Sequence, residues 1–319
     1  MKVVDSVLDL IGNTPMVKLG NIPVAGDAEV YAKLEYLNPS GSMKDRIALE
    51  MIRQAEAEGK LKPGYTIVEA STGNTGIALS FVGRRLGYSV AIYMPEGMTP
   101  ERIRIMERYG AEIHQLKLEE LEASEGSVAG AEVEIPTRQR CLELERSNPK
   151  TWWARQFSNP ANTAAHIKTG REILRQMDGD VDAFVMSIGT GGTLLGVAKA
   201  LRAELPHVRI VAVEPASAKY PLSRGYRKVP GVSDEVSGGM VAELLDSGIV
   251  DEAAQVTNDE AVSMSDRLIT EEGLFAGVSA GANVHVALKT AGQLGGDRKV
   301  VTILPDSGDR YLTERKYTT

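Results

Sequence analysis

Short apolar runs rich in β-branched residues alternate with longer amphipathic stretches along most of this chain. The apolar runs predict strands at residues 30–36, 66–70, 89–94, 112–118, 183–188, 209–214 and 300–304. The stretches between them predict helices at residues 76–86, 100–109, 162–177 and 193–205. Alternation of this kind is typical of parallel sheets that carry helices on both faces. We therefore expect an α/β fold with parallel-rich sheets flanked by helices.

The length of the chain and a break in the pattern near residues 145–155 indicate two α/β lobes with a cleft between them. A chain of 319 residues is longer than most single domains. The net charge of −7, without a cluster of Lys and Arg, argues against nucleic acid as a partner. No apolar run is long enough to cross a bilayer, and we expect neither a signal peptide nor a membrane partner.

The chain has one cysteine, Cys141, which excludes an internal disulfide and fits a reducing compartment. It lies in a helical pattern, so we expect a buried or half-buried structural thiol. The four histidines are scattered without the spacing of metal ligands, so we expect no metal site. Together these features predict a cytoplasmic protein.

A lysine, Lys44, stands between a predicted strand and a helical pattern, within the run N-P-S-G-S-M-K-D-R at residues 38–46. Ligands of open α/β sheets collect at the carboxyl ends of strands. A lysine amine becomes a useful nucleophile when a site desolvates it or surrounds it with positive potential. A helix N-terminus supplies such a potential and also binds anions. The alternative for this residue alone is a surface lysine in a turn.

Three further runs, each with glycines and hydroxyls, stand where strands should end. Residues 69–76 (E-A-S-T-G-N-T-G) gather hydroxyls and an amide at a helix start, where a carboxylate is favoured. Residues 187–193 (S-I-G-T-G-G-T) let backbone N–H groups approach a phosphate, although they match neither a P-loop nor a full dinucleotide fingerprint. Residues 273–281 (G-L-F-A-G-V-S-A-G) place a serine before a helix. Taken singly, the alternatives are a capped turn, a tight turn and close packing of a helix.

A lysine, a phosphate cup and a carboxylate loop suit one phosphate-bearing aldehyde cofactor, pyridoxal 5'-phosphate. The chain resembles the fold-type II pyridoxal phosphate enzymes (tryptophan synthase β-like), specifically the cysteine synthase/cystathionine β-synthase family. The resemblance is nearly full-length and begins at I-G-N-T-P-M-V-K-L, residues 11–19. It continues through the lysine motif, S-T-G-N-T-G, M-P-E, Q-F-S-N-P-A-N, G-T-G-G-T and G-V-S-A-G. It ends at I-L-P-D-S-G-D-R-Y, residues 303–311.

The resemblance implies a role for each motif. Lys44 would carry the cofactor as a Schiff base and later remove the substrate α-proton. Asn74 would hydrogen-bond the phenolic oxygen of the cofactor, and the Ser279 hydroxyl would face its pyridine nitrogen. The implied phosphate cup consists of Gly189, Thr190, Gly191, Gly192 and Thr193. The residues implied to bind the substrate carboxylate are Ser71, Thr72, Gly73, Thr75 and Gln156.

The resemblance also implies how the lobes are arranged. Residues 1–150 would form the smaller N-terminal α/β lobe, with a segment at about 15–36 crossing to the other lobe. Residues 151–319 would form the larger C-terminal lobe with the phosphate cup. A homodimer is implied as well.

The implied reaction is a β-replacement on an activated L-serine. Sulfide would add to an α-aminoacrylate intermediate to give L-cysteine, as in the cysteine synthases (O-acetylserine sulfhydrylases). Alternatives within the family are cystathionine β-synthase, with homocysteine as nucleophile, and a 2,3-diaminopropionate synthase. From other classes, an oxidoreductase would leave Lys44 without a role, and a catalytically inactive homologue would not need the intact lysine and cup.

The sequence departs from the family pattern in two places. The first two hydroxyl residues of the common T-S-G-N-T loop are exchanged here as Ser71 and Thr72, which preserves the number of donors. Residues 226–235 (Y-R-K-V-P-G-V-S-D-E) replace H-K-I-Q-G-I-G, in a stretch that belongs to substrate recognition. Arg224 and Arg227 lie in residues 221–230 (P-L-S-R-G-Y-R-K-V-P), which overlap this stretch, and they suit a phosphate. We expect O-acetylserine as the first choice of donor and O-phosphoserine as the second.

Overall fold

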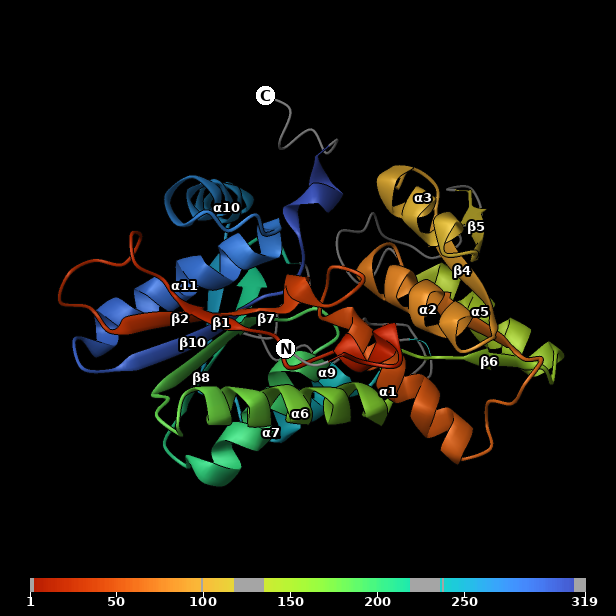
Figure 1. The fold of residues 1–319 in the computed structure, drawn as a ribbon, viewed down its shortest axis with the longest axis horizontal. Coiled ribbons are helices and arrows are strands. Elements are labelled where there is room, and N and C mark those ends of the chain that lie inside the picture. Colours follow the sequence, from red (N-terminus) through yellow and green to blue (C-terminus); the bar gives the residue numbers. More distant parts are fainter. Residues whose placement is uncertain (1–2, 99, 118–134, 219–235, 237, 313–319) are drawn as a thin grey trace. The chain divides into compact units, whose positions relative to one another are not determined.

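The computed structural model describes residues 3–98, 100–117, 135–218, 236 and 238–312. The chain divides into two compact units, which we call unit 1 and unit 2 and describe separately (Figure 1). Unit 1 comprises Met1–Met43, Thr163–Arg227 and Met240–Thr319, and unit 2 comprises Lys44–Asn162 and Lys228–Gly239.

Unit 1 is built on a six-stranded sheet with the order β1-β2-β10-β7-β8-β9. Its strands are β1 (Met16–Lys18), β2 (Glu29–Leu34), β7 (Ala183–Ser187), β8 (Arg209–Pro215), β9 (Glu252–Val256) and β10 (Lys299–Leu304). All neighbours pair in parallel except β1 and β2, which are antiparallel. The parallel arrangement places the ends of β7 and β10 on the same edge, where the following loops carry the predicted cup and the C-terminal motif.

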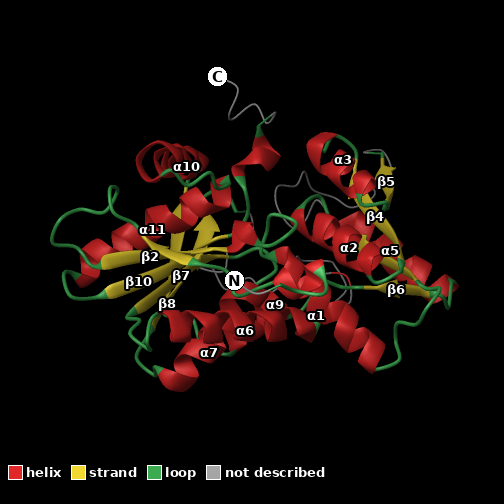
Figure 2. Cartoon of the chain, in the orientation of Figure 1, coloured by secondary structure: helices red, strands yellow, loops and turns green. Residues whose placement is uncertain are grey.

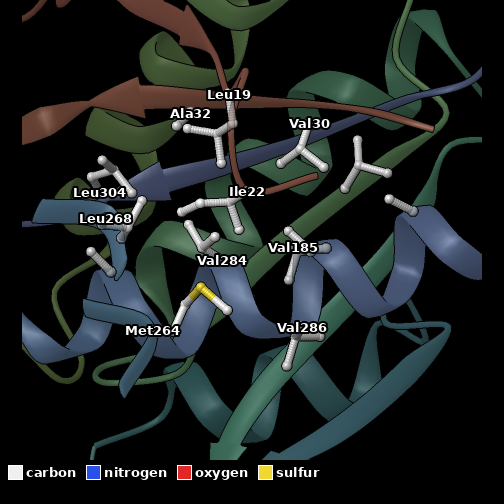
Figure 3. Close-up of a cluster of buried hydrophobic side chains, with 14 of the residues drawn as sticks. Leu19, Ile22, Val30, Ala32, Val185, Met264, Leu268, Val284, Val286 and Leu304 are labelled. Carbon is white, nitrogen blue, oxygen red and sulfur yellow. The ribbon is translucent and has the colours of Figure 1, made fainter. Parts of the chain in front are cut away.

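Helices flank the sheet of unit 1 (Figure 2). They are α6 (Pro160–Gln176), α7 (Gly192–Glu204), α9 (Met240–Asp246), α10 (Asn258–Glu272) and α11 (Val278–Leu294), with the 3-10 helices η1 (Val7–Leu10), η2 (Glu35–Leu37) and η5 (Gly308–Tyr311). Successive side chains of a strand point to opposite faces of the sheet. Val185 joins the buried cluster with Val284 and Leu268 (Figure 3), whereas its neighbour Phe184 joins the cluster of Leu194 on the other face. The near-continuous apolar runs of these strands therefore reflect burial on both faces.

Unit 2 is built on a four-stranded parallel sheet with the order β5-β4-β3-β6. Its elements are α1 (Lys44–Ala57), β3 (Thr66–Ala70), α2 (Asn74–Arg85), β4 (Ser89–Pro95), α3 (Pro100–Arg108), β5 (Glu112–Leu116), α5 (Ile135–Ser147) and β6 (Thr151–Trp153). Helix α1 packs on α2, and α5 packs on β3, β4 and β6. Cys141 of α5 is fully buried among these strands, as expected of a structural thiol.

The units are bounded differently from the expected lobes because pairing, not sequence order, decides membership. Strand β2 pairs with β10 from the far end of the chain, which draws the N-terminal residues into unit 1. Residues 15–36, which were expected to cross to the other lobe, contain β1 and β2, and they lie in unit 1 together with the residues that precede them. The chain passes from unit 1 to unit 2 between Met43 and Lys44, and returns between Asn162 and Thr163.

The expected α/β class with parallel-rich sheets is confirmed, and each predicted strand and helix is present with its ends shifted by two residues or fewer. The pattern missed β1, β6 and β9. Strands β1 and β6 are only three residues long, and β9 (E-A-A-Q-V) has little β-branched content, so none of the three gives a strong signal. In the part of the chain that the structure describes, no helix combines the length and apolar character needed to cross a bilayer.

Candidate active site

Lys44 is the first residue of α1 and is partly exposed. The residues just before it are held within unit 1. Met43 N–H donates to the Pro305 carbonyl at 2.9 Å, and the buried Arg310 guanidinium donates to the Ser40 carbonyl. Gly41 has φ 87°, and a Cβ there would lie 2.9 Å from Arg310 Nη2. The C-terminal motif therefore fixes the turn from which the lysine helix starts, a role that the sequence did not reveal.

A buried polar network supports the start of the same turn. Asn38 Nδ2 donates to the Glu35 carbonyl and carboxylate at 2.8 and 2.9 Å, while its Oδ1 accepts from Gly12 N–H at 2.9 Å. Thr14 Oγ1 donates to Glu35 Oε1 at 2.7 Å. The N-terminal G-N-T motif thus holds the start of the lysine run in place.

Lys33 is a second buried lysine, and its contacts identify it as structural. Its Nζ lies 3.0 Å from Glu172 Oε2 and donates to the Thr14 carbonyl and to Gln176 Oε1, both at 2.9 Å. An ammonium group has three donors, and these three acceptors use all of them. Lys44, at a helix start, remains the candidate for covalent chemistry.

The predicted carboxylate loop joins β3 to α2 in unit 2. Ser71 is buried, and its hydroxyl accepts from Gly73 N–H at 3.3 Å and Gly76 N–H at 3.0 Å. Helix α2 begins at Asn74, so the dipole of the helix adds positive potential at the loop. Ser71 therefore shapes the loop, and the side chains of Thr72 and Asn74 are partly exposed beside it.

Gln156 ties this loop to the segment that follows β6. Thr75 Oγ1 donates to Gln156 Oε1 at 2.6 Å, and Gln156 Nε2 donates to the Ala70 carbonyl at 2.9 Å. The Ala70 carbonyl only accepts, which fixes the orientation of the amide. One N–H of Gln156 is committed to the loop and the second is its only donor for a ligand. The proton of the Thr75 hydroxyl points to Gln156, so Thr75 offers a ligand its backbone N–H.

Glu69, the last acidic residue before the loop, is fully buried and was given no role by the sequence reasoning. Its Oε1 accepts from Trp153 Nε1 at 2.9 Å and from Ala70 N–H at 2.8 Å. Its Oε2 accepts from Gln156 N–H at 2.9 Å. The Glu69 carboxylate thus connects the end of β3 to the segment that contains Gln156. The signal that could have identified it in the sequence is that Glu69 is the only charged residue of β3 (T-I-V-E-A).

The predicted phosphate cup joins β7 to α7 in unit 1. Gly191 has φ 90°, a conformation that favours glycine, and it is the N-cap of α7 without a capping side chain. Gly192 N–H donates to Thr190 Oγ1 at 3.4 Å. Thr193 is buried and its hydroxyl lies 3.1 Å from His166 Nε2, so this side chain braces α7 against α6. Gly189 has no atom within 4 Å of an added Cβ, so the open backbone at this helix start suits an anion.

Ser279 is the second residue of α11, also in unit 1, and is partly exposed. Asn283 on the next turn of α11 accepts from Ser187 N–H at 2.8 Å, which joins this helix to the end of β7. The glycines of the motif allow close packing, because a Cβ on Gly281 would lie 2.0 Å from the Ala261 carbonyl oxygen. Close packing of a helix, the alternative given for this run, is therefore observed, and it is compatible with the predicted role of Ser279.

The structure thus gathers the predicted residues into two sets, one in each unit. In unit 1, Asn283 joins the cup to the helix of Ser279. In unit 2, Lys44 and Asn74 each begin a helix, and these two helices pack on each other. Arg224 and Arg227 lie outside the described residues. The roles assigned to these residues stay predictions.

A family model described as "Pyridoxal-phosphate dependent enzyme" matches residues 7–306. A cysteine synthase of Staphylococcus aureus (strain N315) is 43% identical over 319 residues, which covers 99% of this chain and 98% of that protein. The crystal structure of a cysteine synthase from Entamoeba histolytica matches with a TM-score of 0.85 at 33% identity, covering 100% of this chain and 92% of that one.

A hydrogen sulfide-producing enzyme from Fusobacterium nucleatum matches with a TM-score of 0.84 at 36% identity, covering 98% of this chain and 99% of the other. All of these matches extend over nearly the whole chain, as the order of the motifs predicted. They confirm the resemblance inferred from the motifs, and with it the class of cofactor.

Proposed function

The chain belongs to the family of pyridoxal-phosphate dependent enzymes, and from this we propose that it makes L-cysteine from an activated L-serine and sulfide. The observation that carries the proposal is the identity of 43% with a cysteine synthase over 99% of this chain and 98% of that protein. O-Acetylserine is the proposed first donor and O-phosphoserine the second.

Each of the two sets, taken by itself, has chemistry that suits the cofactor. In unit 1, the start of α7 combines a glycine at φ 90° with an open backbone at Gly189, which suits a phosphate. In unit 2, Lys44 starts α1, where the helix dipole disfavours a protonated amine and so favours its use as a nucleophile. When bound, pyridoxal phosphate withdraws the electrons left at the α-carbon after its proton is removed.

We propose the following division of labour among the chain's residues. Lys44 Nζ holds the cofactor and then takes the α-proton of the substrate. The loop at residues 71–75 and Gln156 bind the substrate carboxylate through backbone N–H groups, side-chain donors and the positive end of α2. The Ser279 hydroxyl is neutral, so it leaves the ring nitrogen without a full charge and favours loss of the β-substituent.

The test is a panel of donors with purified, cofactor-loaded protein. O-Acetylserine, O-phosphoserine and L-serine are each combined with sulfide or with homocysteine, and the products are identified by mass spectrometry. Cysteine from O-acetylserine and sulfide, with ping-pong kinetics, is the expected result. Cystathionine as the main product would replace the proposal with cystathionine β-synthase activity, and turnover with an amine nucleophile would indicate 2,3-diaminopropionate synthesis.

A second candidate activity is release of sulfide from L-cysteine, which is favoured by the similarity to the Fusobacterium nucleatum enzyme named as hydrogen sulfide-producing. The same panel tests it when L-cysteine is supplied alone. Sulfide release faster than cysteine synthesis under matched conditions would make it the main function.

Arg224 and Arg227 are proposed to select between the donors. A guanidinium recognises phosphate by paired, charge-assisted hydrogen bonds, and losing one costs about 1.5–3 kcal/mol. Arg224→Ala and Arg227→Ala should therefore lower kcat/KM for O-phosphoserine and spare O-acetylserine. Equal losses for the two donors, or none, would show that both arginines are solvated charges.

We also propose that the protein acts as a homodimer in the cytoplasm. The buried free thiol of Cys141 suits a reducing compartment. Light scattering of the purified protein tests the dimer, and a monomer at working concentration would refute it.

A further inference from the structure

Arg155 has an unusual backbone conformation for its residue type. Its φ is 56°, in the left-handed region that side chains with a Cβ rarely adopt. Among the described residues, the other non-glycine positions with positive φ are Asn13, Asp178 and Asp297, whose short polar side chains tolerate it. An arginine in this conformation requires its surroundings to hold it there.

Contacts from α5 and β6 supply that constraint. The Arg155 guanidinium forms a two-pronged pair with the Glu145 carboxylate, with Nη1 to Oε1 at 2.8 Å and Nη2 to Oε2. It also lies over the Trp153 ring, 4.7 Å from the ring centroid. Glu145 Oε1 additionally accepts from Trp153 N–H at 3.0 Å, so one carboxylate holds both sides of the bend. We call these three residues the Arg155 clamp.

The bend delivers the next residue, Gln156, to the carboxylate loop. The Arg155 carbonyl accepts from Ser158 N–H at 3.0 Å and Asn159 N–H at 2.8 Å, so the chain turns tightly on its far side. On its near side, Gln156 is buried and bonded to Glu69, Ala70 and Thr75. A change of φ at residue 155 would rotate Gln156 away from all of these partners.

We infer that Arg155 is a positioning residue: its side chain holds a strained bend that sets the Gln156 amide against the substrate loop. The inference rests on the proposed function, because that proposal gives Gln156 and the loop the substrate carboxylate. Everything that carries it lies in unit 2, and Arg155 itself is half-buried.

Two substitutions separate the side chain from the backbone. Arg155→Ala removes the clamp and keeps a Cβ, so the backbone should relax out of the left-handed region. Arg155→Gly removes the clamp but makes that region accessible without strain. If the clamp acts through the bend, alanine is the more damaging change and glycine a partial rescue. A role in charge or packing alone would make the two variants equal.

The measurement is the dissociation constant of L-alanine, followed by the visible absorption of the cofactor-loaded protein. L-Alanine has the α-amino and α-carboxyl groups but no β-leaving group, so binding is read without turnover. We expect Arg155→Ala to weaken L-alanine binding about tenfold, the factor that corresponds to the strain of one left-handed residue. Arg155→Gly should weaken it about threefold or less, with unchanged cofactor content in both variants.

The control is Asp178→Gly, which changes an exposed left-handed residue at the end of α6 and should leave L-alanine binding and melting temperature close to wild type. If Arg155→Ala does not fold, Glu145→Gln is the variant that tests the inference, because it weakens the clamp while residue 155 is unchanged. Glu145→Gln should also weaken L-alanine binding.

Equal effects of alanine and glycine, wild-type affinity in the variants, or no L-alanine binding by the wild type would overturn the inference. Failure of the proposed function shows separately, as wild-type protein that binds L-alanine but makes no cysteine from O-acetylserine and sulfide.

Discussion

Replacing Glu69 with glutamine tests whether this buried carboxylate holds the substrate loop to the segment after β6. The carboxylate accepts from Trp153 and Ala70 at one oxygen and from Gln156 at the other. Glutamine has one oxygen, so its amide group must face a donor on one side. If the oxygen stays with Trp153 and Ala70, the new side-chain NH2 group faces the backbone N–H of Gln156, and both groups are donors.

The size of the effect follows from the bonds lost. One hydrogen bond to a charged acceptor disappears, which costs about 1.5–3 kcal/mol, and the other two weaken because their acceptor becomes neutral. Removing a buried charge offsets part of this cost. We therefore expect Glu69→Gln to lower the free energy of unfolding by about 2–4 kcal/mol. It should also raise the KM for the amino-acid donor, because the Gln156 backbone loses its partner.

The assay is equilibrium urea unfolding followed by tryptophan fluorescence, with the KM measured on the folded protein. The matched control is Glu112→Gln, an exposed glutamate on β5 of the same sheet, which should change stability by less than about 0.5 kcal/mol. A Glu69→Gln protein with wild-type stability and an unchanged KM would refute the reasoning, because the carboxylate would then not be the joint that its contacts indicate.

Lys44→Ala should abolish turnover and the borohydride-reducible link to the cofactor; attachment found by peptide mass spectrometry at another lysine would contradict its assignment. Gly281→Ala should destabilise the protein by about 1–3 kcal/mol in thermal or urea unfolding, because its Cβ would meet the Ala261 carbonyl 2.0 Å away. Burial and the bond from its hydroxyl to Glu56 raise the pKa of Tyr88 to about 12. Stability from this group should be intact below pH 10 and fall towards pH 12, less so in Tyr88→Phe; identical pH dependence in both proteins would refute it.

The sequence alone was enough to predict the candidate site because each of its motifs is local. Lys44, the loop at 71–75, the cup and Ser279 stand at helix starts, and a short run of glycines and hydroxyls is enough to identify such a start. The contacts that each side chain makes within its loop could not be predicted from the sequence. Ser71 and Thr193 look like ligand donors in the sequence. In the structure the Ser71 hydroxyl accepts from two backbone N–H groups of its own loop, and the Thr193 hydroxyl lies 3.1 Å from His166 Nε2.

Hydrophobic periodicity along the chain determined the α/β class and most of the strands, because a strand buried on both faces and an amphipathic helix each leave a pattern within one segment. Only the tertiary structure decided which segments are neighbours. The pairing of β2 with β10 and the contacts of Glu69 and Arg310 join residues that are far apart in sequence. Such contacts depend on how sheets and helices pack, and no local pattern records them. The scaffold that holds the candidate site therefore became visible only in the folded chain.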